Sequence, residues 1–130
     1  MKRPSVLFVC KHNTGRSQMA EAYLRHFCGD AVDVSSAGTI AASLPDAGVV
    51  AAMADDGIDI SGQRPKLLDP ARVAAADYVI TMGCDVAGVE RIDDDWGLPD
   101  PKGAPSDRIR EIRDLVKSKA QALAARLQSG

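Results

Sequence analysis

The segment from Cys10 to Ser17 carries the clearest chemical potential in the chain. It reads Cys-Lys-His-Asn-Thr-Gly-Arg-Ser and lies between an apolar run and an amphipathic stretch. Five residues between cysteine and arginine can curl so that backbone N–H groups point inward, and the N-terminus of a following helix adds positive potential. Arg16 could close the ring with a bidentate guanidinium. The segment therefore predicts a pocket for one tetrahedral oxyanion, with the Cys10 thiolate as nucleophile.

The other side chains of this segment are predicted to bind the oxyanion or to support the loop. Ser17, at the predicted helix cap, could donate its hydroxyl to the sulfur. Asn13 could hold the loop by bonds to the backbone, and Gly15 permits geometry that a side chain would resist. Thr14 is a further substrate-binding candidate, whereas Lys11 and His12 either add positive field at the pocket or are simply solvated.

Asp100 is the predicted general acid. It stands between Pro99 and Pro101 in a loop after Trp96, and the two prolines stiffen that loop. A thiolate that attacks a tetrahedral centre needs the departing oxygen protonated, which a fixed carboxylic acid can do. An Asp-Pro pair alone is usually a turn, so this assignment depends on the Cys10 loop upstream.

Composition limits the classes of function. The 130 residues fit one domain, so residues 1–130 are predicted to form a single domain with one active site. Sixteen Lys and Arg against 18 Asp and Glu offer no basic surface for nucleic acid. We also expect no metal, no membrane contact and a cytoplasmic location, because no zinc-ligand cluster, signal peptide or membrane-length segment is present. A monomer is the default expectation.

Strands alternate with helices along the chain, which predicts an α/β fold with a parallel sheet covered on both faces, a three-layer sandwich. The expected strands are 5–9, 31–36, 77–82 and a weaker 91–95, and the expected helices are 17–27, 45–57, 69–73 and 106–127. Ligands in such folds bind beyond the carboxyl ends of the strands. Cys10, Cys84 and the loop after Trp96 would all lie there.

Taken together, these residues resemble the arsenate reductases built on the low-molecular-weight protein tyrosine phosphatase fold. The resemblance runs almost end to end and rests on residues 10–21, 35–38, 57–61, 81–84, 95–96 and 100–101. It implies a four-stranded parallel sheet and the reduction of arsenate to arsenite, for arsenic detoxification. It further implies that Cys10 attacks arsenic, that Arg16 and the loop amides hold the oxyanion, and that Asp100 protonates the leaving oxygen.

Two alternatives remain open. A low-molecular-weight protein tyrosine phosphatase is the nearer one, because phosphate and arsenate share shape and charge. The phosphatases of this fold usually carry proline after Arg-Ser, where this chain has Gln18, and aromatics after Asp-Pro, where it has Lys102. The other alternative is a noncatalytic oxyanion-binding module, which would need neither Cys10 nor Asp100.

Release of arsenite requires a second thiol. Cys84 is the internal candidate, although it could equally be a buried cysteine at a strand end, and Cys28 is interpreted as structural. Thioredoxin-coupled members of the family use a pair of resolving cysteines in and after this region, and residues 85–91 contain none. This favours an external thiol, mycothiol or glutathione with a mycoredoxin-like or glutaredoxin-like partner, over thioredoxin. No tightly bound cofactor is expected.

Some members of the family bind potassium near the catalytic loop through residues that match Asn13, Glu21 and Ser36. Where those proteins carry an aspartate, this chain reads Gln-Arg-Pro-Lys over residues 63–66. The cation site thus loses a charge, and Lys66 could stand in its place. We therefore predict that no metal is required.

Overall fold

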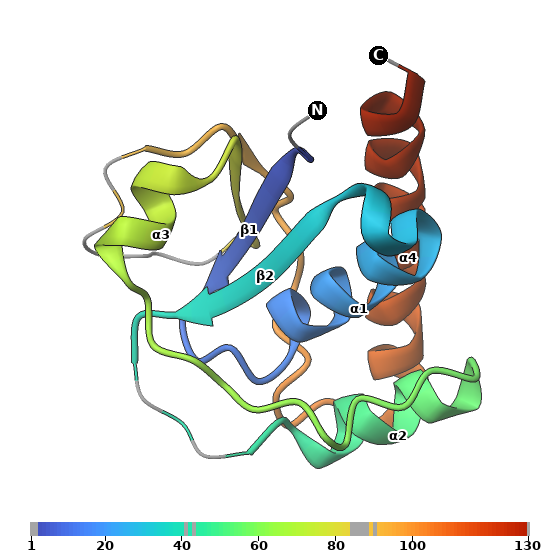
Figure 1. The fold of residues 1–130 in the computed structure, drawn as a ribbon. Helices are drawn as coiled ribbons and strands as arrows, with labels where there is room; N and C mark the ends of the chain where they lie inside the picture. The colour runs from blue at the N-terminus through green and yellow to red at the C-terminus, as the bar shows by residue number, and fades with distance from the viewer. Residues whose placement is uncertain (1–2, 41, 43, 84–88, 90, 130) are drawn as a thin grey trace.

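The computed structural model describes residues 3–40, 42, 44–83, 89 and 91–129. Four parallel strands form one sheet in the order β2-β1-β3-β4 (Figure 1). Their bounds are β1 (Ser5–Cys10), β2 (Asp33–Gly38), β3 (Tyr78–Thr81) and β4 (Asp94–Asp95). The predicted α/β fold with a four-stranded parallel sheet is confirmed. The second strand begins later than expected, because residues 29–31 form a 3₁₀ turn.

Helices cover both faces of the sheet (Figure 1). Their bounds are α1 (Arg16–Cys28), α2 (Ala47–Asp55), α3 (Pro70–Ala75) and α4 (Ser106–Ser129). Phe8 and Cys10 point into the core shared with α1 and α4, whereas Leu7 and Val9 point to the α3 side. The central strand β1 is therefore buried on both faces, which explains its continuous apolar run.

Local signals fix where the helices begin and which face they bury. Asp46 caps α2 by accepting from the backbone N–H groups of Gly48 and Val49, and Asp69 caps α3 ahead of Pro70. The long helix α4 buries one stripe, as its spacing predicts: Ile109, Ile112, Val116, Ala120 and Leu123. None of the helices within the described residues is long and apolar enough to cross a membrane.

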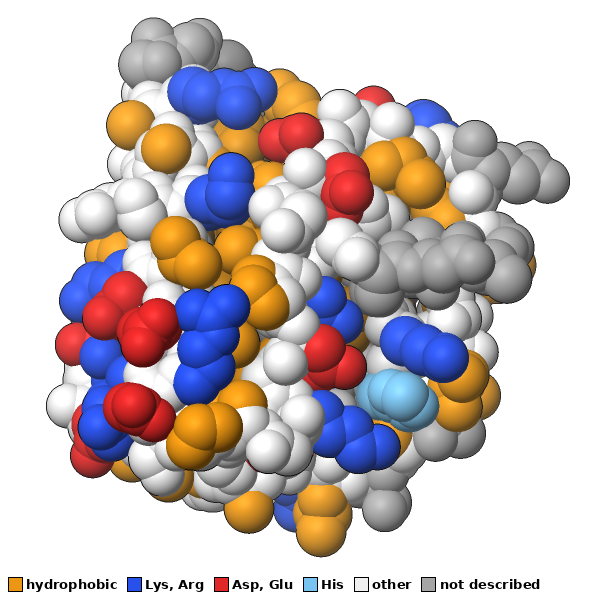
Figure 2. All heavy atoms as spheres, turned by 180° about the vertical axis from the view of Figure 1, so that it is seen from behind, with side chains coloured by type: hydrophobic (Ala, Val, Ile, Leu, Met, Phe, Trp, Pro, Cys, Tyr) orange, Lys and Arg blue, Asp and Glu red, His pale blue; other side chains and the backbone are white. Residues whose placement is uncertain are grey.

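The face of the molecule seen in Figure 2 carries mixed charge. Acidic and basic side chains are interspersed there with apolar ones, and no broad basic field is visible. Such a face offers no continuous electrostatic track for a phosphate backbone.

A polar cluster of Tyr23, Asp56 and Lys117 joins α1, the end of α2 and α4. The Tyr23 hydroxyl donates to Asp56 Oδ2 at 2.7 Å, and Lys117 Nζ lies 2.9 Å from the same oxygen. The hydrogen bond from Tyr23, followed by that from Lys117, holds the pKa of Asp56 below its ordinary value. Burial raises the pKa of Tyr23, with the bond to Asp56 adding to the shift. The cluster is therefore most favourable with Asp56 ionised and Tyr23 neutral.

Asp56→Asn is expected to lower the free energy of unfolding by about 1 kcal/mol near neutral pH, because the ion pair with Lys117 is lost. A carboxylate whose pKa is lowered by folding stabilises the protein above its unfolded pKa and loses that effect as the pH falls through the folded value. The difference from wild type should therefore narrow below about pH 4. Urea denaturation near neutral pH and below about pH 4 measures this difference in unfolding free energy. Asp55→Asn is the control, because Asp55 is a neighbouring carboxylate that is 60% exposed. A difference that persists in acid would contradict the electrostatic origin.

Candidate active site

The segment after β1 curls tightly over the end of β2. Cys10 pairs with Gly38 across the sheet, and a Cβ at Gly38 would lie 2.7 Å from the His12 carbonyl carbon and 2.8 Å from Lys11 O. Such contacts with backbone atoms cannot be relieved cheaply, so only glycine fits there. The backbone N–H of Ile40 also donates to Lys11 O at 2.9 Å. The loop therefore packs directly on the end of β2.

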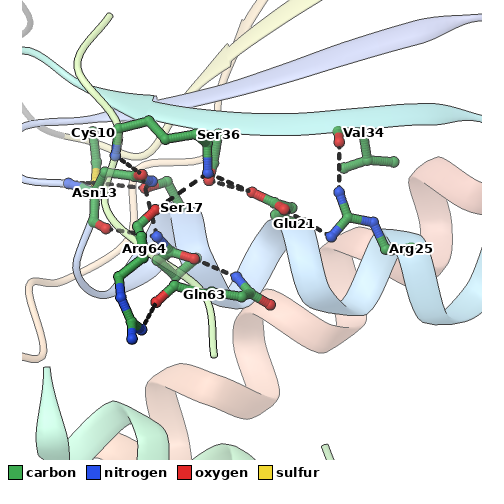
Figure 3. Close-up of polar contacts among 11 residues, drawn as sticks. Cys10, Asn13, Ser17, Glu21, Arg25, Val34, Ser36, Gln63 and Arg64 are labelled. Carbon is green, nitrogen blue, oxygen red and sulfur yellow. Dashed lines mark hydrogen bonds and ion pairs between the residues drawn. The ribbon is translucent and has the colours of Figure 1, made fainter. Parts of the chain in front are cut away.

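The Cys10 sulfur receives two hydrogen bonds. Ser17 Oγ lies 2.8 Å from it, and the backbone N–H of Asn13 donates to it at 3.3 Å (Figure 3). Asn13 Nδ2 also donates to Ser17 Oγ at 2.8 Å, which leaves the Ser17 hydroxyl proton to point at the sulfur. Asn13 has φ 56°, a left-handed conformation that asparagine tolerates. Both donors therefore face the Cys10 sulfur.

The predicted position of Ser17 at the helix cap is wrong. Helix α1 begins at Arg16, its cap residue is Gly15, and the cap makes no side-chain hydrogen bond. Ser17 therefore lies within the first turn. Its hydroxyl is used by Asn13 and Cys10, so the helix start depends on the backbone freedom of glycine rather than on a side-chain cap.

Asn13 is held from behind by two polar groups, one of which is itself supported by Gln63. The backbone N–H of Lys66 donates to Asn13 Oδ1 at 2.9 Å, and Gln18 Nε2 donates to Asn13 O at 2.9 Å. Gln63 in turn donates to the Gln18 side chain. The supporting roles of Gln18 and Gln63 were not predicted from the sequence. Gln18 is a polar residue in the first turn of α1, a helix that is buried on nearly every side, and this position could have indicated its role.

Arg16 is nearly buried and is oriented by two backbone carbonyls. Its Nη1 donates to Met82 O at 3.0 Å and to Leu98 O at 2.6 Å. These bonds fix the guanidinium without engaging Nε or Nη2, the pair that a bidentate contact with an oxyanion would use. Arg16 is thus positioned before any ligand arrives.

These groups surround a pocket of about 80 Å³, the size for a small tetrahedral anion. Its lining brings together Cys10, Lys11, His12, Thr14, Gly15, Arg16, Asp100 and Lys102. Pro101 explains how Asp100 arrives there, because a Cβ at Gly15 would lie only 3.1 Å from Pro101 Cγ. Close packing of the proline on the loop therefore carries the neighbouring carboxylate to the pocket mouth.

A larger pocket, of about 330 Å³, lies at the opposite end of the sheet. It is lined by Arg3, Ser5, Val6, Asp33, Ser35, Arg72, Ala75 and Ala76. It contains neither a thiol nor a histidine, and it lies at the amino ends of the parallel strands rather than at the carboxyl ends, where ligands of such sheets bind. The smaller pocket at Cys10 is therefore the candidate active site.

A buried carboxylate beside the loop is surrounded by positive charge. Glu21 accepts from the Ser36 hydroxyl and lies 2.8 Å from Arg25 Nη1 (Figure 3). Lys66 Nζ lies 3.6 Å from the same carboxylate. The amide oxygen of Asn13, which could otherwise face a cation, already accepts from the Lys66 backbone. The residues that match potassium ligands are thus engaged by this chain's own donors and cations, so they do not fit a metal ion, and no step below involves one. In the part of the chain that the structure describes, no three His, Cys, Asp or Glu side chains cluster as metal ligands.

The chain has two further cysteines, Cys28 and Cys84. Cys84 lies outside the described residues. Cys28 is buried at the end of α1, and burial raises the pKa of its thiol, which makes it a poor nucleophile.

Comparison with known proteins agrees with this geometry. Residues 5–91 match the model of the low molecular weight phosphotyrosine protein phosphatase family. The glutaredoxin arsenate reductase of Synechocystis sp. is 34% identical over 128 residues, which cover 94% of this chain and 97% of that protein. A solved structure of an arsenate reductase in the phosphate binding state superposes with a TM-score of 0.84 at 33% identity, covering 95% of this chain and 98% of that one.

A further solved relative is the thioredoxin-dependent arsenate reductase of Corynebacterium glutamicum, with a TM-score of 0.79 and 36% identity. The superposed region covers 98% of this chain and 63% of the Corynebacterium chain. The chain belongs to the low molecular weight phosphotyrosine protein phosphatase family. Within that family it is similar to proteins named arsenate reductases, which confirms the resemblance read from the sequence.

Proposed function

We propose that this chain is an arsenate reductase in which Cys10 is the nucleophile. The observation that supports this most directly is the environment of the Cys10 sulfur, with the Ser17 hydroxyl at 2.8 Å and the Asn13 N–H at 3.3 Å. Arg16 and Asp100 line the same pocket. The similarity to proteins named arsenate reductases favours arsenate among tetrahedral oxyanions.

In the first step, arsenate enters the loop and is held by inward N–H groups and by the guanidinium of Arg16. The Cys10 thiolate attacks arsenic and forms a sulfur–arsenic bond. One arsenate oxygen departs and takes a proton from Asp100, leaving as water. Arsenic is still arsenic(V) at this point, and the adduct is a cysteine thioester of arsenate.

In the second step, another thiolate attacks the Cys10 sulfur. A disulfide forms, the sulfur–arsenic bond breaks, and its electron pair stays on arsenic, which leaves as arsenite. The two sulfurs have together supplied the two electrons. A further thiol then reduces the disulfide and regenerates Cys10.

We propose that the second thiol is an external one, mycothiol or glutathione, with a mycoredoxin-like or glutaredoxin-like protein as the final reductant. The name of the Synechocystis relative supports glutaredoxin coupling, whereas that of the Corynebacterium relative names thioredoxin. Cys84 has no second cysteine over residues 85–91, so a thioredoxin relay would lack one of its thiols. The enzyme would work as a monomer in the cytoplasm, where such thiols stay reduced.

Phosphatase activity is the second candidate, because the family model that matches is that of phosphatases. Lys102, rather than an aromatic residue, lines the pocket beside Asp100. A wall on which a phosphotyrosine ring could stack is therefore missing at that side. We expect any cleavage of aryl phosphates to be a weak side reaction.

The deciding experiment measures arsenite formed from arsenate by purified protein with three reductants: mycothiol and mycoredoxin, glutathione and glutaredoxin, or thioredoxin and its reductase. Cleavage of p-nitrophenyl phosphate is followed in parallel. Arsenite formation supports the reductase, and the productive system identifies the thiol. Brisk aryl phosphate cleavage without arsenite would make the protein a phosphatase. Phosphate binding without either reaction would leave a noncatalytic oxyanion-binding module.

Lys66 is proposed to replace a metal cation beside the catalytic loop. Its ammonium balances Glu21 from 3.6 Å while its backbone N–H holds Asn13. Lys66→Met should lower kcat/KM for arsenate by about threefold, since the Lys66 side chain is 44% exposed and solvent screens its charge. Wild-type activity should be unchanged when choline replaces potassium in the buffer.

Arg64→Met is the matched control, because Arg64 donates to the Ser61 and Gln63 carbonyls and makes no contact with Glu21. Steady-state kinetics of the three proteins in both buffers test the proposal. Activation of the wild-type enzyme by potassium, or an equal loss in Arg64→Met, would argue against it.

A further inference from the structure

The orientation of Arg16 depends on two loops at the carboxyl edge of the sheet. Met82 follows β3 and Leu98 lies shortly after β4, and their carbonyl oxygens are the two acceptors for Arg16 Nη1. The strand β4 has only two residues, so backbone pairing alone gives these loops little support. Whatever holds the two loops together also sets the angle of the guanidinium.

The carboxylate of Asp95 joins these loops. Asp95 Oδ1 accepts from Thr81 Oγ1 at 3.0 Å and from the backbone N–H of Gly83 at 2.7 Å, the residues on either side of Met82. The N–H of Gly97, directly before Leu98, lies 3.4 Å from the same oxygen. One carboxylate oxygen therefore faces donors from both loops, next to both carbonyls that hold Arg16.

The two loops are also in direct backbone contact. A Cβ at Gly83 would lie 2.7 Å from the backbone nitrogen of Leu98 and 2.8 Å from Gly97 C, and Gly83 has φ 88°. The N–H of Leu98 donates to Met82 O at 3.2 Å. A small shift of either loop would thus move both acceptors of Arg16.

We propose that Asp95 is a positioning residue for oxyanion binding, which acts by fixing the Met82 and Leu98 carbonyls that orient Arg16. Asp95 does not line the pocket, and its carboxylate partners are Thr81, Gly83 and Gly97 rather than Cys10. The inference rests on the proposed oxyanion site but not on arsenate turnover, because its effect is on binding. Binding of inorganic phosphate therefore tests it even if the reductase activity were absent.

The matched control is Asp93, two residues earlier on the same edge. Asp93 Oδ2 accepts from the Val79 N–H at 2.8 Å and from Arg91 Nε at 3.1 Å, so it also links β3 to this edge, but neither partner flanks a carbonyl that holds Arg16. A merely structural role would make Asp95 and Asp93 equivalent. Both variants should lower the melting temperature, but only the loss of Asp95 should weaken anion binding.

The experiment measures the Kd for inorganic phosphate by titration calorimetry. Asp95→Ala is expected to weaken binding by about tenfold, and Asp95→Asn, which keeps an oxygen acceptor, by about threefold or less. Asp93→Asn should stay within about twofold of wild type. If Asp95→Ala does not fold, Thr81→Val removes one donor to the same oxygen and should weaken binding by about threefold.

A double-mutant cycle with Arg16→Lys tests the route of the effect. Lysine keeps the charge but not the guanidinium geometry that the two carbonyls orient. Asp95→Ala should therefore cost little further affinity in the Arg16→Lys protein. A full tenfold loss in that background, an equal loss in Asp93→Asn, or unchanged binding in Asp95→Ala would each overturn the proposal.

Discussion

Replacing Cys10 by serine is expected to reduce arsenite formation by about 10,000-fold or more, while the Kd for phosphate changes by about threefold or less. A serine hydroxyl at this position has no adjacent base, since Ser17 and Asn13 are donors toward Cys10. Even a serine ester of arsenate could not be reduced, because oxygen cannot form the disulfide that leaves the electron pair on arsenic. The measurement is arsenite production with the productive thiol system, alongside phosphate titration.

Cys28→Ser is the control for this substitution. Cys28 is buried at the far end of α1, and burial raises the pKa of its thiol. The Cys28→Ser protein should therefore retain arsenite formation within about twofold of wild type, because it loses only a small buried side chain. Turnover that survives in Cys10→Ser would remove Cys10 as the nucleophile, whatever the behaviour of the control.

Much of the fold could be predicted because its signals are local. The apolar run of β1, the glycine within the oxyanion loop and the apolar stripe of α4 each reflect a period or a turn that neighbouring residues encode. The structure places α1 at Arg16–Cys28 and α4 at Ser106–Ser129, close to the predicted bounds. The weakest prediction, a strand over 91–95, shrinks to Asp94–Asp95, where few apolar residues were available to support it.

Only the part of the site that lies within one continuous segment could be predicted. Cys10, Asn13 and Ser17 lie within eight residues, so their mutual contacts follow from one loop and one helical turn. The helix cap was misassigned because serine is a common cap and Gly15 carries no side-chain signal.

Contacts between segments far apart in the chain could not be predicted from the sequence. The bond from Arg16 to Leu98 O joins residues 82 positions apart, and Lys66 reaches Asn13 across 53 positions. No period or spacing encodes such pairs, because they depend on how the sheet and its loops assemble in three dimensions. The proline-flanked loop predicted Asp100 as the acid, and the structure adds the contact of Pro101 with Gly15 that places it.

Asp100→Asn is expected to slow formation of the cysteine–arsenic adduct by about 100- to 1,000-fold, the size of effect typical of a lost general acid. The amide has nearly the shape of the carboxyl group and can still accept from the Lys102 N–H, a bond of 3.0 Å in the wild-type protein. The loop should therefore keep its conformation. The amide cannot deliver a proton to the departing oxygen.

Single-turnover arsenate consumption without an added thiol measures this step, and phosphate titration measures binding in the same variant. Asp107→Asn is the control, since Asp107 is an exposed carboxylate in the first turn of α4 that accepts only locally, from the Arg108 N–H at 3.0 Å. Because adduct formation precedes attack by the second thiol, the loss in Asp100→Asn should be the same with every reductant. An equal loss of phosphate affinity would instead assign Asp100 to anion binding rather than to proton transfer.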